Sequence, residues 1–478
     1  MGQEISSSDF SEQDFQAFEQ QLQQQTQTLS RWFAEKRFVN REKLGGFELE
    51  ACLVDKDCLP LCCNQAFIEA MACEYLSPEL ASFNVEFNFT PQALEKRGLY
   101  DFEQEMQKRW LRGEEIAKQL GAQLMMIGIL PTIRDVDLVS KHLSDMARYK
   151  ALNDQVLRLR HGKPIQLDIQ GDDILRMQHP DVMLESATTS FQIHFQVPLD
   201  LSLRLYNASL VASAPMVAVS ANSPYFFEKS LWAETRIPLF EQSVESGGYQ
   251  DAAHGPMRRV TFGSGYARQS LMECFQENLD HYPVLLASEL HSADRFAHLR
   301  LHNGTLWRWN RPLIGQEDES GENYHVRVEH RVMPAGPSIL DSVANAAFYF
   351  GLSYALAIET PAAEAQISFA DARDNFYAAA KLGLDAHMRW HEQEKVRAPS
   401  LILNKLLPLA WEGLQQLGIQ QSDIKKYLGI IEQRVARQCN GCNWQRAYVA
   451  KHGKDMVKLA KAYLQRQQSG EPVHEWSL

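Results

Sequence analysis

The sequence lacks several features that would assign it to a common class of protein. It has no apolar run long enough to cross a bilayer, and its first residues, MGQEISSSDF, lack the basic and apolar regions of a signal peptide. Basic residues are outnumbered, with 48 Lys and Arg against 60 Asp and Glu, which argues against a general nucleic-acid binder. We therefore expect a cytoplasmic protein with no membrane and no nucleic-acid partner.

The sequence also has few of the cysteine motifs that bind metals and lacks the glycine-rich motif that binds phosphate. The eight cysteines include one CxxC, formed by Cys439 and Cys442, but no second CxxC or HxxxH accompanies it. We interpret these two residues as reduced thiols beside a turn, and whether they bind a metal stays open. The phosphate-binding pattern GxxxxGK[ST] is absent. A bound nucleotide would therefore be held by other groups, such as arginines and metal ions.

The order of predicted elements indicates an α+β fold in three parts. Apolar residues at helical spacing predict an amphipathic helix within residues 1–43 that packs on the core. Residues 44–360 mix short strands with helices without regular alternation, which disfavours a doubly wound parallel sheet. Residues 361–478 have helical periodicity, and the acidic piece 311–324 is interpreted as a surface loop. Oligomeric state is not encoded in any pattern, although chains of this size often form homo-oligomers.

Four strand-like segments carry polar side chains at every second position. Alternate side chains of a strand line one face, so the apolar residues between them would form the opposite face. A single such strand would be interpreted as the solvated face of a half-exposed sheet. The four faces together hold no Lys, Thr or Ser, which favours a shared ligand-binding face. Their polar positions are Glu48 and Glu50; Asn84, Glu86 and Asn88; Gln192, His194 and Gln196; and His325, Arg327, Glu329 and Arg331.

The residue types on these faces suit divalent cations and phosphate. Four glutamates on one face would repel one another, because neighbouring carboxylates raise each other's pKa. Divalent ions relieve this repulsion, and Mg²⁺ typically takes a few carboxylates together with substrate phosphates and water. Arg327 and Arg331 share a strand face with Glu329, and arginines there suit a transferring phosphoryl group. The sequence therefore predicts a site for ATP and two or more Mg²⁺ ions.

Five short motifs follow one another between residues 44 and 355. They are GFELE at 46–50, NVEFN at 84–88 followed by Thr90 and Pro91, SFQIHF at 190–195, ANSP at 221–224 and RVEHR at 327–331. In this order they resemble the glutamate–cysteine ligase superfamily with its carboxylate–amine ligase branch. The resemblance implies a glutamine-synthetase-like fold, in which a curved antiparallel sheet has flanking helices and, in this chain, a helical C-terminal region.

The resemblance also implies a role for each matching residue. Arg331 resembles the arginine that stabilises the phosphoryl group, and an acid such as Glu86 or Asp55 would help to deprotonate the amine. The residues around His194 and in segment 332–337 depart from the better-known branches, which leaves the substrate open. Contacts with ATP or substrate are expected of Arg327, Arg311, Asn222 and Ser223, and the expected metal ligands are Glu48, Glu50, Glu86, His194 and Glu329.

The activity implied is that of an ATP- and Mg-dependent ligase. It would activate a carboxylate, such as the γ-carboxylate of glutamate, as an acyl phosphate and join it to an amine such as cysteine. Both substrates are small molecules. Three alternatives stay open: a metal-dependent phosphohydrolase that uses the same acids and His194, a non-catalytic Mg-ATP sensor, and a guanidino kinase of related fold.

Overall fold

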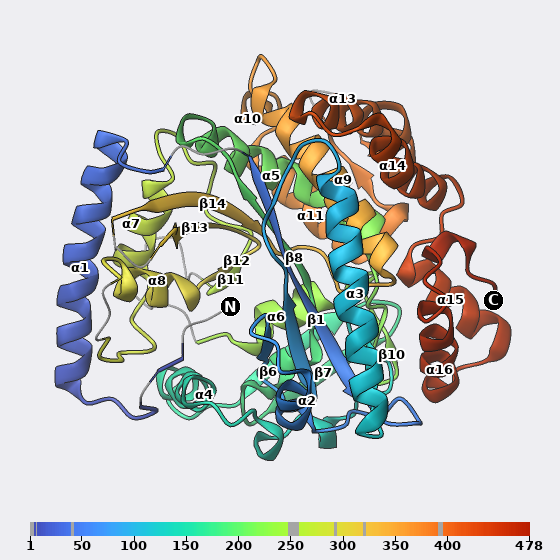
Figure 1. Ribbon diagram of the computed structural model, residues 1–478. Coiled ribbons are helices and arrows are strands. Elements are labelled where there is room, and N and C mark those ends of the chain that lie inside the picture. Colours follow the sequence, from blue (N-terminus) through green and yellow to red (C-terminus); the bar gives the residue numbers. More distant parts are fainter. Residues whose placement is uncertain are drawn as a thin grey trace.

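A curved, eight-stranded antiparallel sheet runs through the middle of the molecule (Figure 1). The computed structural model describes residues 4–5, 7–39, 43–246, 258–290, 294–318, 322–390 and 395–478. The strand order is β13-β14-β8-β1-β3-β2, and β4 and β5 also pair with β1. The α+β fold expected from the sequence is confirmed. The strands are β1 (Leu44–Val54), β2 (Leu76–Pro78), β3 (Asn84–Asn88), β4 (Gln92–Ala93), β5 (Gln123–Met125), β8 (Phe191–Gln196), β13 (Asn310–Gln316) and β14 (Tyr324–His330).

Helices α3 (Gly98–Gln119), α5 (Leu199–Ser220) and α9 (Ile339–Ile358) cover the apolar face of this sheet. The ring of Phe47 on β1 packs 4.1 Å from that of Phe102 on α3 and 6.0 Å from that of Phe350 on α9. Phe350 also packs 5.1 Å from Phe195 on β8. Burying each such ring stabilises the fold by about 1.5–3 kcal/mol, so this aromatic cluster holds β1 and β8, which carry predicted site residues, in place.

Helix α1 (Glu12–Glu35) confirms the amphipathic helix predicted near the N-terminus. It packs against α7 (Met272–His281) and α8 (Ala297–Gly304), where the ring of Trp32 lies 5.1 Å from that of Phe296. Polar residues interrupt its apolar stripe at Gln25, whose Oε1 accepts a hydrogen bond of 3.0 Å from the backbone N–H of Leu299. The hydrogen bond of Gln25 therefore links α1 to α8, and α8 borders the candidate site.

The described residues after 360 are largely helical, and β15 (His387–Met388) pairs with β16 (Val396–Arg397) among them. Helix α13 packs along α9 so closely that a Cβ on Gly413 would lie 2.0 Å from the carbonyl oxygen of Gly351. The main cluster of buried apolar side chains runs from Ile5 to Trp476, and the division at residues 43 and 360 stays a prediction. The helices of this region are α10 (Ala363–Gln366), α11 (Phe369–Leu382), α12 (Ala398–Leu401), a π-helical stretch (Ile402–Leu406), α13 (Leu407–Leu417), α14 (Gln421–Ala436), α15 (Gly441–His452) and α16 (Met456–Gln467).

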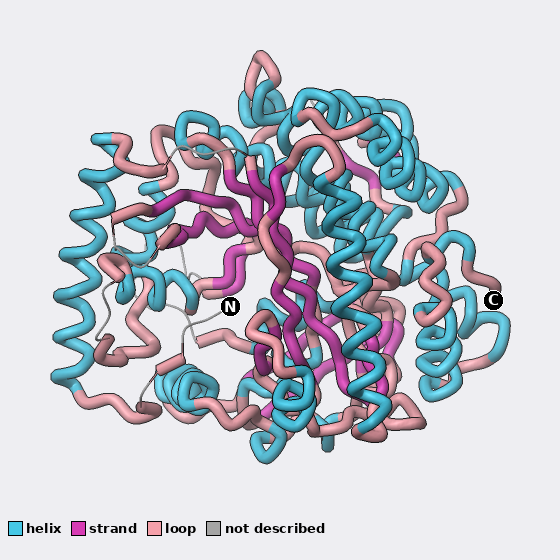
Figure 2. Tube along the Cα trace, viewed as in Figure 1, coloured by secondary structure: helices cyan, strands magenta, loops and turns pink. Residues whose placement is uncertain are grey.

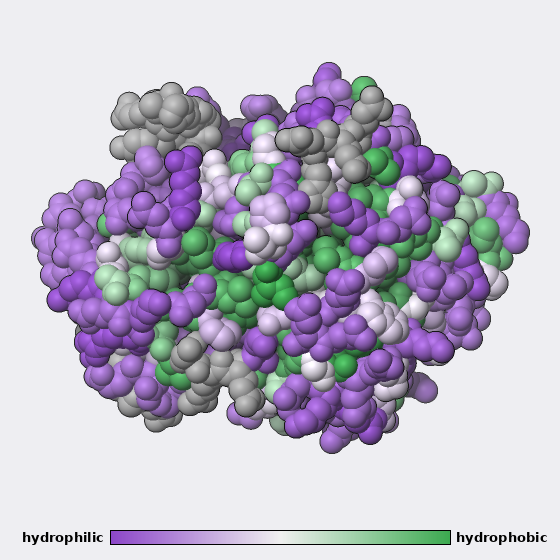
Figure 3. Space-filling view, turned by 90° about the horizontal axis from the view of Figure 1, so that it is seen from above, coloured by the Kyte–Doolittle hydropathy of each residue, from purple (hydrophilic) through white to green (hydrophobic). Residues whose placement is uncertain are grey.

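Smaller elements surround the sheet (Figure 2). From above, hydrophobic side chains gather toward the middle of the molecule within a hydrophilic rim (Figure 3). Within the described residues, none of the helices combines the length and apolar character needed to cross a bilayer. The remaining helices and strands are α2 (Asn64–Met71), α4 (Ala147–Leu159), α6 (Arg236–Ser243), β6 (Ile165–Gln170), β7 (Ile174–His179), β9 (Tyr225–Phe226), β10 (Lys229–Ser230), β11 (Val260–Thr261), β12 (Trp307–Arg308) and short 3₁₀ turns at Asp135–Asp137, Ser140–His142, Val182–Ala187, Gly383–Asp385 and Val473–Glu475.

The interpretation of residues 311–324 as a surface loop is wrong. Its first part, up to Gln316, belongs to β13, and its last residue, Tyr324, begins β14. Proline cannot donate a hydrogen bond to a sheet, so Pro312 argues against an interior strand. β13 stands at the end of the strand order, and an edge strand tolerates proline. Arg311 is therefore held by the sheet and not by a loop.

Candidate active site

The polar face of the sheet brings residues from four strands into one row. Arg311 on β13 is opposite Glu329 on β14, Glu329 is opposite His194 on β8, and His194 is opposite Gly46 on β1. Opposed residues of antiparallel strands share a face. Glu48, two residues beyond Gly46, lies on the same face as this row. The alternation read from the sequence therefore corresponds to one surface.

Three of the five expected metal ligands form a compact cluster. Glu48, His194 and Glu329 are buried, and one ligand atom from each lies within 4.8 Å of the others. His194 Nε2 lies 3.1 Å from Glu48 Oε1, outside hydrogen-bond geometry, and has no hydrogen-bond partner among the described residues. Two carboxylates and an imidazole suit a divalent cation. The donor set and the orphaned nitrogen fit the expected ion.

Arg327 fixes the orientation of the His194 ring. Its Nε donates to His194 Nδ1 at 3.1 Å, so Nδ1 is an acceptor and the proton of the neutral ring is on Nε2. One guanidinium nitrogen of Arg327 also lies 2.9 Å from His325 Nε2, and His325 Nδ1 lies 2.7 Å from Glu317 Oε1. Binding of a cation at His194 Nε2 therefore requires Arg327 to release Nδ1.

Gly315 on β13 leaves the space in which Arg327 and His325 meet. A Cβ at this position would lie 2.3 Å from Arg327 and from the His325 ring, so Gly315→Ala should displace both side-chain ends. We expect activity to fall about tenfold, the order expected for a misplaced active-site group. Urea unfolding should shift little. Gly429→Ala, which adds a methyl group in open space on α14, is the matched control, and equal activity in the two variants would contradict this prediction.

Glu329 is held by two arginines. Arg311 forms a two-pronged contact with its carboxylate at 2.9 and 3.1 Å, and Arg331 donates to it at 3.2 Å. Burial alone would raise the pKa of Glu329, but the charges of Arg311 and Arg331 outweigh it and lower the pKa to about 2. Glu329 is therefore ionised at neutral pH and available to a cation.

Arg311 and Arg331 differ in how many hydrogen bonds their guanidinium groups make with the protein. Arg311 also donates to the backbone carbonyls of Asn303, Gly304 and Leu306, so in this structure it supports Glu329, and its expected contact with substrate stays a prediction. Arg331 additionally donates to the Gln192 side chain, and its Nε has no hydrogen-bond partner among the described residues. The catalytic role of Arg331 likewise stays a prediction.

Glu50 and Glu86 lie on the same face, opposite each other, but outside the three-residue cluster. Glu50 accepts hydrogen bonds of 2.7 Å from both the backbone and the hydroxyl of Ser190. Glu86 accepts from the side chain of Asn88 at 3.0 Å. Burial and the charges of Glu48 and Glu50 raise the pKa of Glu86 to about 7. Glu86 can therefore exchange a proton near neutrality, while the expected roles of both residues as ligands stay predictions.

Asn222 and Ser223, from which contacts with ATP or substrate are expected, hold together parts of the fold in this structure. Both are fully buried, and neither lines a cavity at the site. The Asn222 amide donates to the Ala335 carbonyl at 2.9 Å and to the Tyr463 hydroxyl at 2.8 Å, and the Ser223 hydroxyl donates to Glu234 at 2.6 Å. Because their polar atoms link the end of α5 to α16 and to Glu234, this pair supports the fold in this structure, and its expected contact with ATP or substrate stays a prediction.

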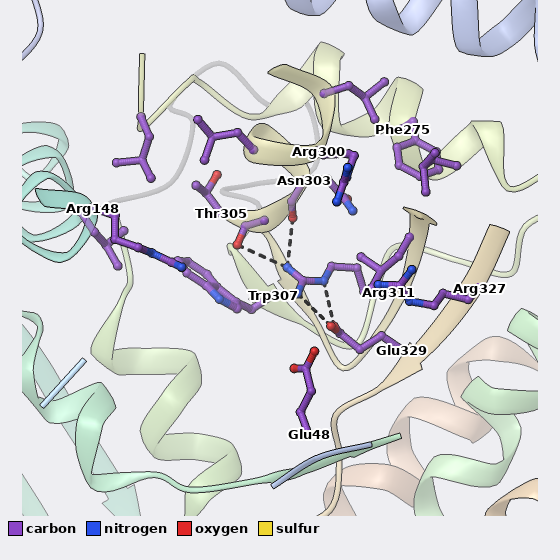
Figure 4. Close-up of a pocket in the computed structure, with 17 residues that line it drawn as sticks. Glu48, Arg148, Phe275, Arg300, Asn303, Thr305, Trp307, Arg311, Arg327 and Glu329 are labelled. Atoms are coloured by element: carbon purple, nitrogen blue, oxygen red, sulfur yellow. Dashed lines mark hydrogen bonds and ion pairs between the residues drawn. The ribbon is translucent and has the colours of Figure 1, made fainter. Parts of the chain in front are cut away.

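Two cavities adjoin the cluster and share Glu48 and Arg327 as lining residues. The first cavity has a volume of about 110 Å³, and Glu329 lines it (Figure 4). The second cavity, of about 330 Å³, is lined by both Gly45 and His194. The first cavity contains residues that sequence reasoning did not single out as site residues, namely Arg148, Leu152, Phe275, Leu299, Arg300, Asn303, Thr305 and Trp307.

The fold of this chain is similar to the folds of two solved enzymes. It is similar to the glutamate–cysteine ligase of Francisella tularensis in complex with AMP, with 12% identity, 90% of each chain covered and a TM-score of 0.55. It is also similar to a bifunctional glutathione synthetase from Pasteurella multocida, with 12% identity, 89% of this chain and 53% of that chain covered and a TM-score of 0.51. At these identities the likeness shows the fold.

The family follows from the sequence match. The model of glutamate–cysteine ligase family 2 matches residues 45–472, and the chain belongs to this family. The protein is therefore an ATP-dependent carboxylate–amine ligase, and the resemblance seen in the five motifs is confirmed. A comparison with curated protein sequences gave no match.

Proposed function

We propose that this ligase binds Mg²⁺ through Glu48, His194 and Glu329, phosphorylates a substrate carboxylate and transfers the acyl group to an amine. The observation that carries the proposal is the clustering of three ligand atoms within 4.8 Å between two cavities that share Glu48 and Arg327. Bound Mg²⁺ would neutralise the charge of the ATP phosphates. Participation of Glu50 and Glu86 in holding a second ion is part of the same proposal.

The sizes of the cavities support a division between the two substrates. The first cavity, at about 110 Å³, is too small for a nucleotide and suits the carboxylate substrate, such as glutamate. The second cavity, at about 330 Å³, has the two adjacent glycines Gly45 and Gly46 in its wall and is the candidate position for ATP. The metal ligands would then stand between the carboxylate and the γ-phosphoryl group.

The reaction proceeds in two displacements. A carboxylate oxygen attacks the γ-phosphorus while the bond to ADP breaks, and Arg331 stabilises the charge on the transferring group. The amine nitrogen then attacks the acyl carbon, phosphate leaves, and the amine loses a proton. Glu86 is the candidate acceptor of that proton. No protein nucleophile is required.

The test is to incubate the purified protein with ATP, Mg²⁺, glutamate and a panel of amines that includes cysteine. ADP should form together with an amide of the expected mass, and both should disappear when EDTA removes the metal. Phosphate release without an amine would favour the phosphohydrolase, a stable phosphorylated product would favour the kinase, and binding without turnover would favour the sensor. Absence of ADP with every carboxylate–amine pair would overturn the ligase proposal.

The cellular setting follows from the same proposal. We infer that the protein is cytoplasmic, that its substrates are small molecules and that it has no membrane or nucleic-acid partner. A homo-oligomer stays a prediction. Size-exclusion chromatography with light scattering measures the last of these directly.

A further inference from the structure

We propose that Arg148 binds the anionic group of the carboxylate substrate that is remote from the reacting carboxylate, and so selects an amino dicarboxylic acid. The inference rests on the proposed function, because it takes the first cavity as the pocket for the carboxylate substrate. Nothing in the strand motifs points to Arg148, which belongs to α4 and not to the sheet.

The argument begins with the arginines that line the first cavity. Arg300 is paired with Asp294 at 2.6 Å, Arg311 is occupied by Glu329, and Arg327 contacts two histidine rings. The backbone N–H of Arg148 donates to Glu4 at 3.3 Å. By contrast, the Arg148 guanidinium makes no hydrogen bond or ion pair with any residue in the described part of the chain. Among these four arginines, Arg148 has the guanidinium that is available to a ligand.

Helix α4 presents Arg148 to the cavity from a firmly held position. Arg148 and Leu152 both line the cavity, and residues four apart lie on one face of a helix. The buried Tyr149 between them fastens the helix, because its hydroxyl donates to the carbonyl of Pro78 on β2 at 3.1 Å. Figure 4 shows Arg148 entering from the side of Trp307, while Glu48 and Glu329 lie on another side of the cavity. The guanidinium and the metal-ligand cluster can thus bind different ends of one small molecule.

The rest of the cavity indicates what joins those two ends. Its wall combines apolar and polar groups: Leu152, Phe275 and Leu299 are among the apolar lining residues, and Asn303 and Thr305 are among the polar ones. A volume of about 110 Å³ indicates a small ligand. A short aliphatic chain with an anionic group at each end matches these features. Arginine suits the remote group because its guanidinium binds a carboxylate through two parallel hydrogen bonds.

Arg148 could instead serve only as a counter-charge for nearby acids. Burial raises the pKa of Glu79 and of Glu185, and the charge of Arg148 opposes the rise at both. A counter-charge role depends on charge alone, so lysine would satisfy it. Recognition of a carboxylate by the planar guanidinium group depends on shape as well as charge, so lysine replaces arginine incompletely in that role. The two roles therefore differ in what Arg148→Lys does.

The experiment compares Arg148→Ala and Arg148→Lys with Lys150→Ala, which removes a cation from an exposed position on the same helix. For Arg148→Ala, KM for glutamate should rise about 10- to 100-fold, the size expected for losing a hydrogen bond to a charged group, while KM for ATP stays unchanged. Arg148→Lys should be intermediate, and Lys150→Ala should match the wild type. An unchanged KM for glutamate in Arg148→Ala, an equal rise in KM for ATP, or full recovery in Arg148→Lys would overturn the inference.

A binding measurement separates this inference from the proposed function. Calorimetric titration of the wild type in the presence of ADP and Mg²⁺ should show binding of glutamate and much weaker binding of γ-aminobutyrate, which lacks the remote carboxylate. Arg148→Ala should lose this preference. If glutamate binds with that preference but no ADP ever forms, the function is wrong and the role of Arg148 is retained. If the wild type binds both compounds equally or neither, the role of Arg148 is refuted.

Discussion

Replacing Glu329 by glutamine should reduce kcat by about a thousandfold or more, the order seen when an essential electrostatic group is lost. Glu329 contributes one of the three clustered ligand atoms. Its carboxylate is negatively charged because Arg311 and Arg331 lower its pKa to about 2. The amide keeps the shape of the side chain and removes the charge. Steady-state ADP formation measures the loss.

The stability of Glu329 variants should depend on the substitution. Glu329→Ala leaves Arg311 buried without its partner, and breaking a buried ion pair in this way costs about 3–5 kcal/mol. Glu329→Gln can still accept hydrogen bonds and should cost less. Glu412→Gln, at an exposed position on α13, is the control for removal of a carboxylate. Wild-type turnover in Glu329→Gln would refute the site assignment.

Placing aspartate at Leu49 should prevent folding. Leu49 is fully buried on the apolar face of β1, between Phe87 on β3 and Phe191 on β8. An unpaired carboxylate there would cost more than about 4 kcal/mol, a large share of the stability of an ordinary domain. Circular dichroism and urea unfolding of the soluble fraction measure the effect.

The conservative change at the same position is the control. Leu49→Met keeps the volume and apolar character, and such swaps usually cost less than about 1.5 kcal/mol. A folded, cooperative Leu49→Asp variant would show that the apolar face of β1 is not part of the core. That result would also remove the support for the opposite, polar face.

The sheet-borne part of the site could be predicted because strand geometry is local. Side chains alternate between two faces in any strand, so the spacing of Glu48 and Glu50, or of Arg327 and Glu329, already implies a common face. Composition then indicated the chemistry, because a face with glutamates and imidazole but without Lys, Thr or Ser is unusual for a solvated surface. Of the expected ligands, Glu48, His194 and Glu329 come together.

The sequence was less informative where burial, and not residue type, decides a role. Asn222 and Ser223 have polar side chains at the end of a helix, and their sequence motif does not reveal that Ala335, Tyr463 and Glu234 take up their hydrogen bonds. The acidic composition of residues 311–324 indicated a loop, and the sequence does not show that β13 lies at the edge of the sheet, where a strand tolerates Pro312. Both facts depend on neighbours far away in the chain.

The amino-acid sequence by itself determined the four strand segments that carry the site, their polar and apolar faces and the acid-imidazole-arginine chemistry, since a period of two residues and side-chain type are both local properties. Only the tertiary structure decided which of these groups meet and what encloses them. Arg148 on α4, Trp307 on β12 and Asn303 on α8 line one cavity with Glu48 on β1, because packing of the whole chain brings together segments that share no sequence pattern.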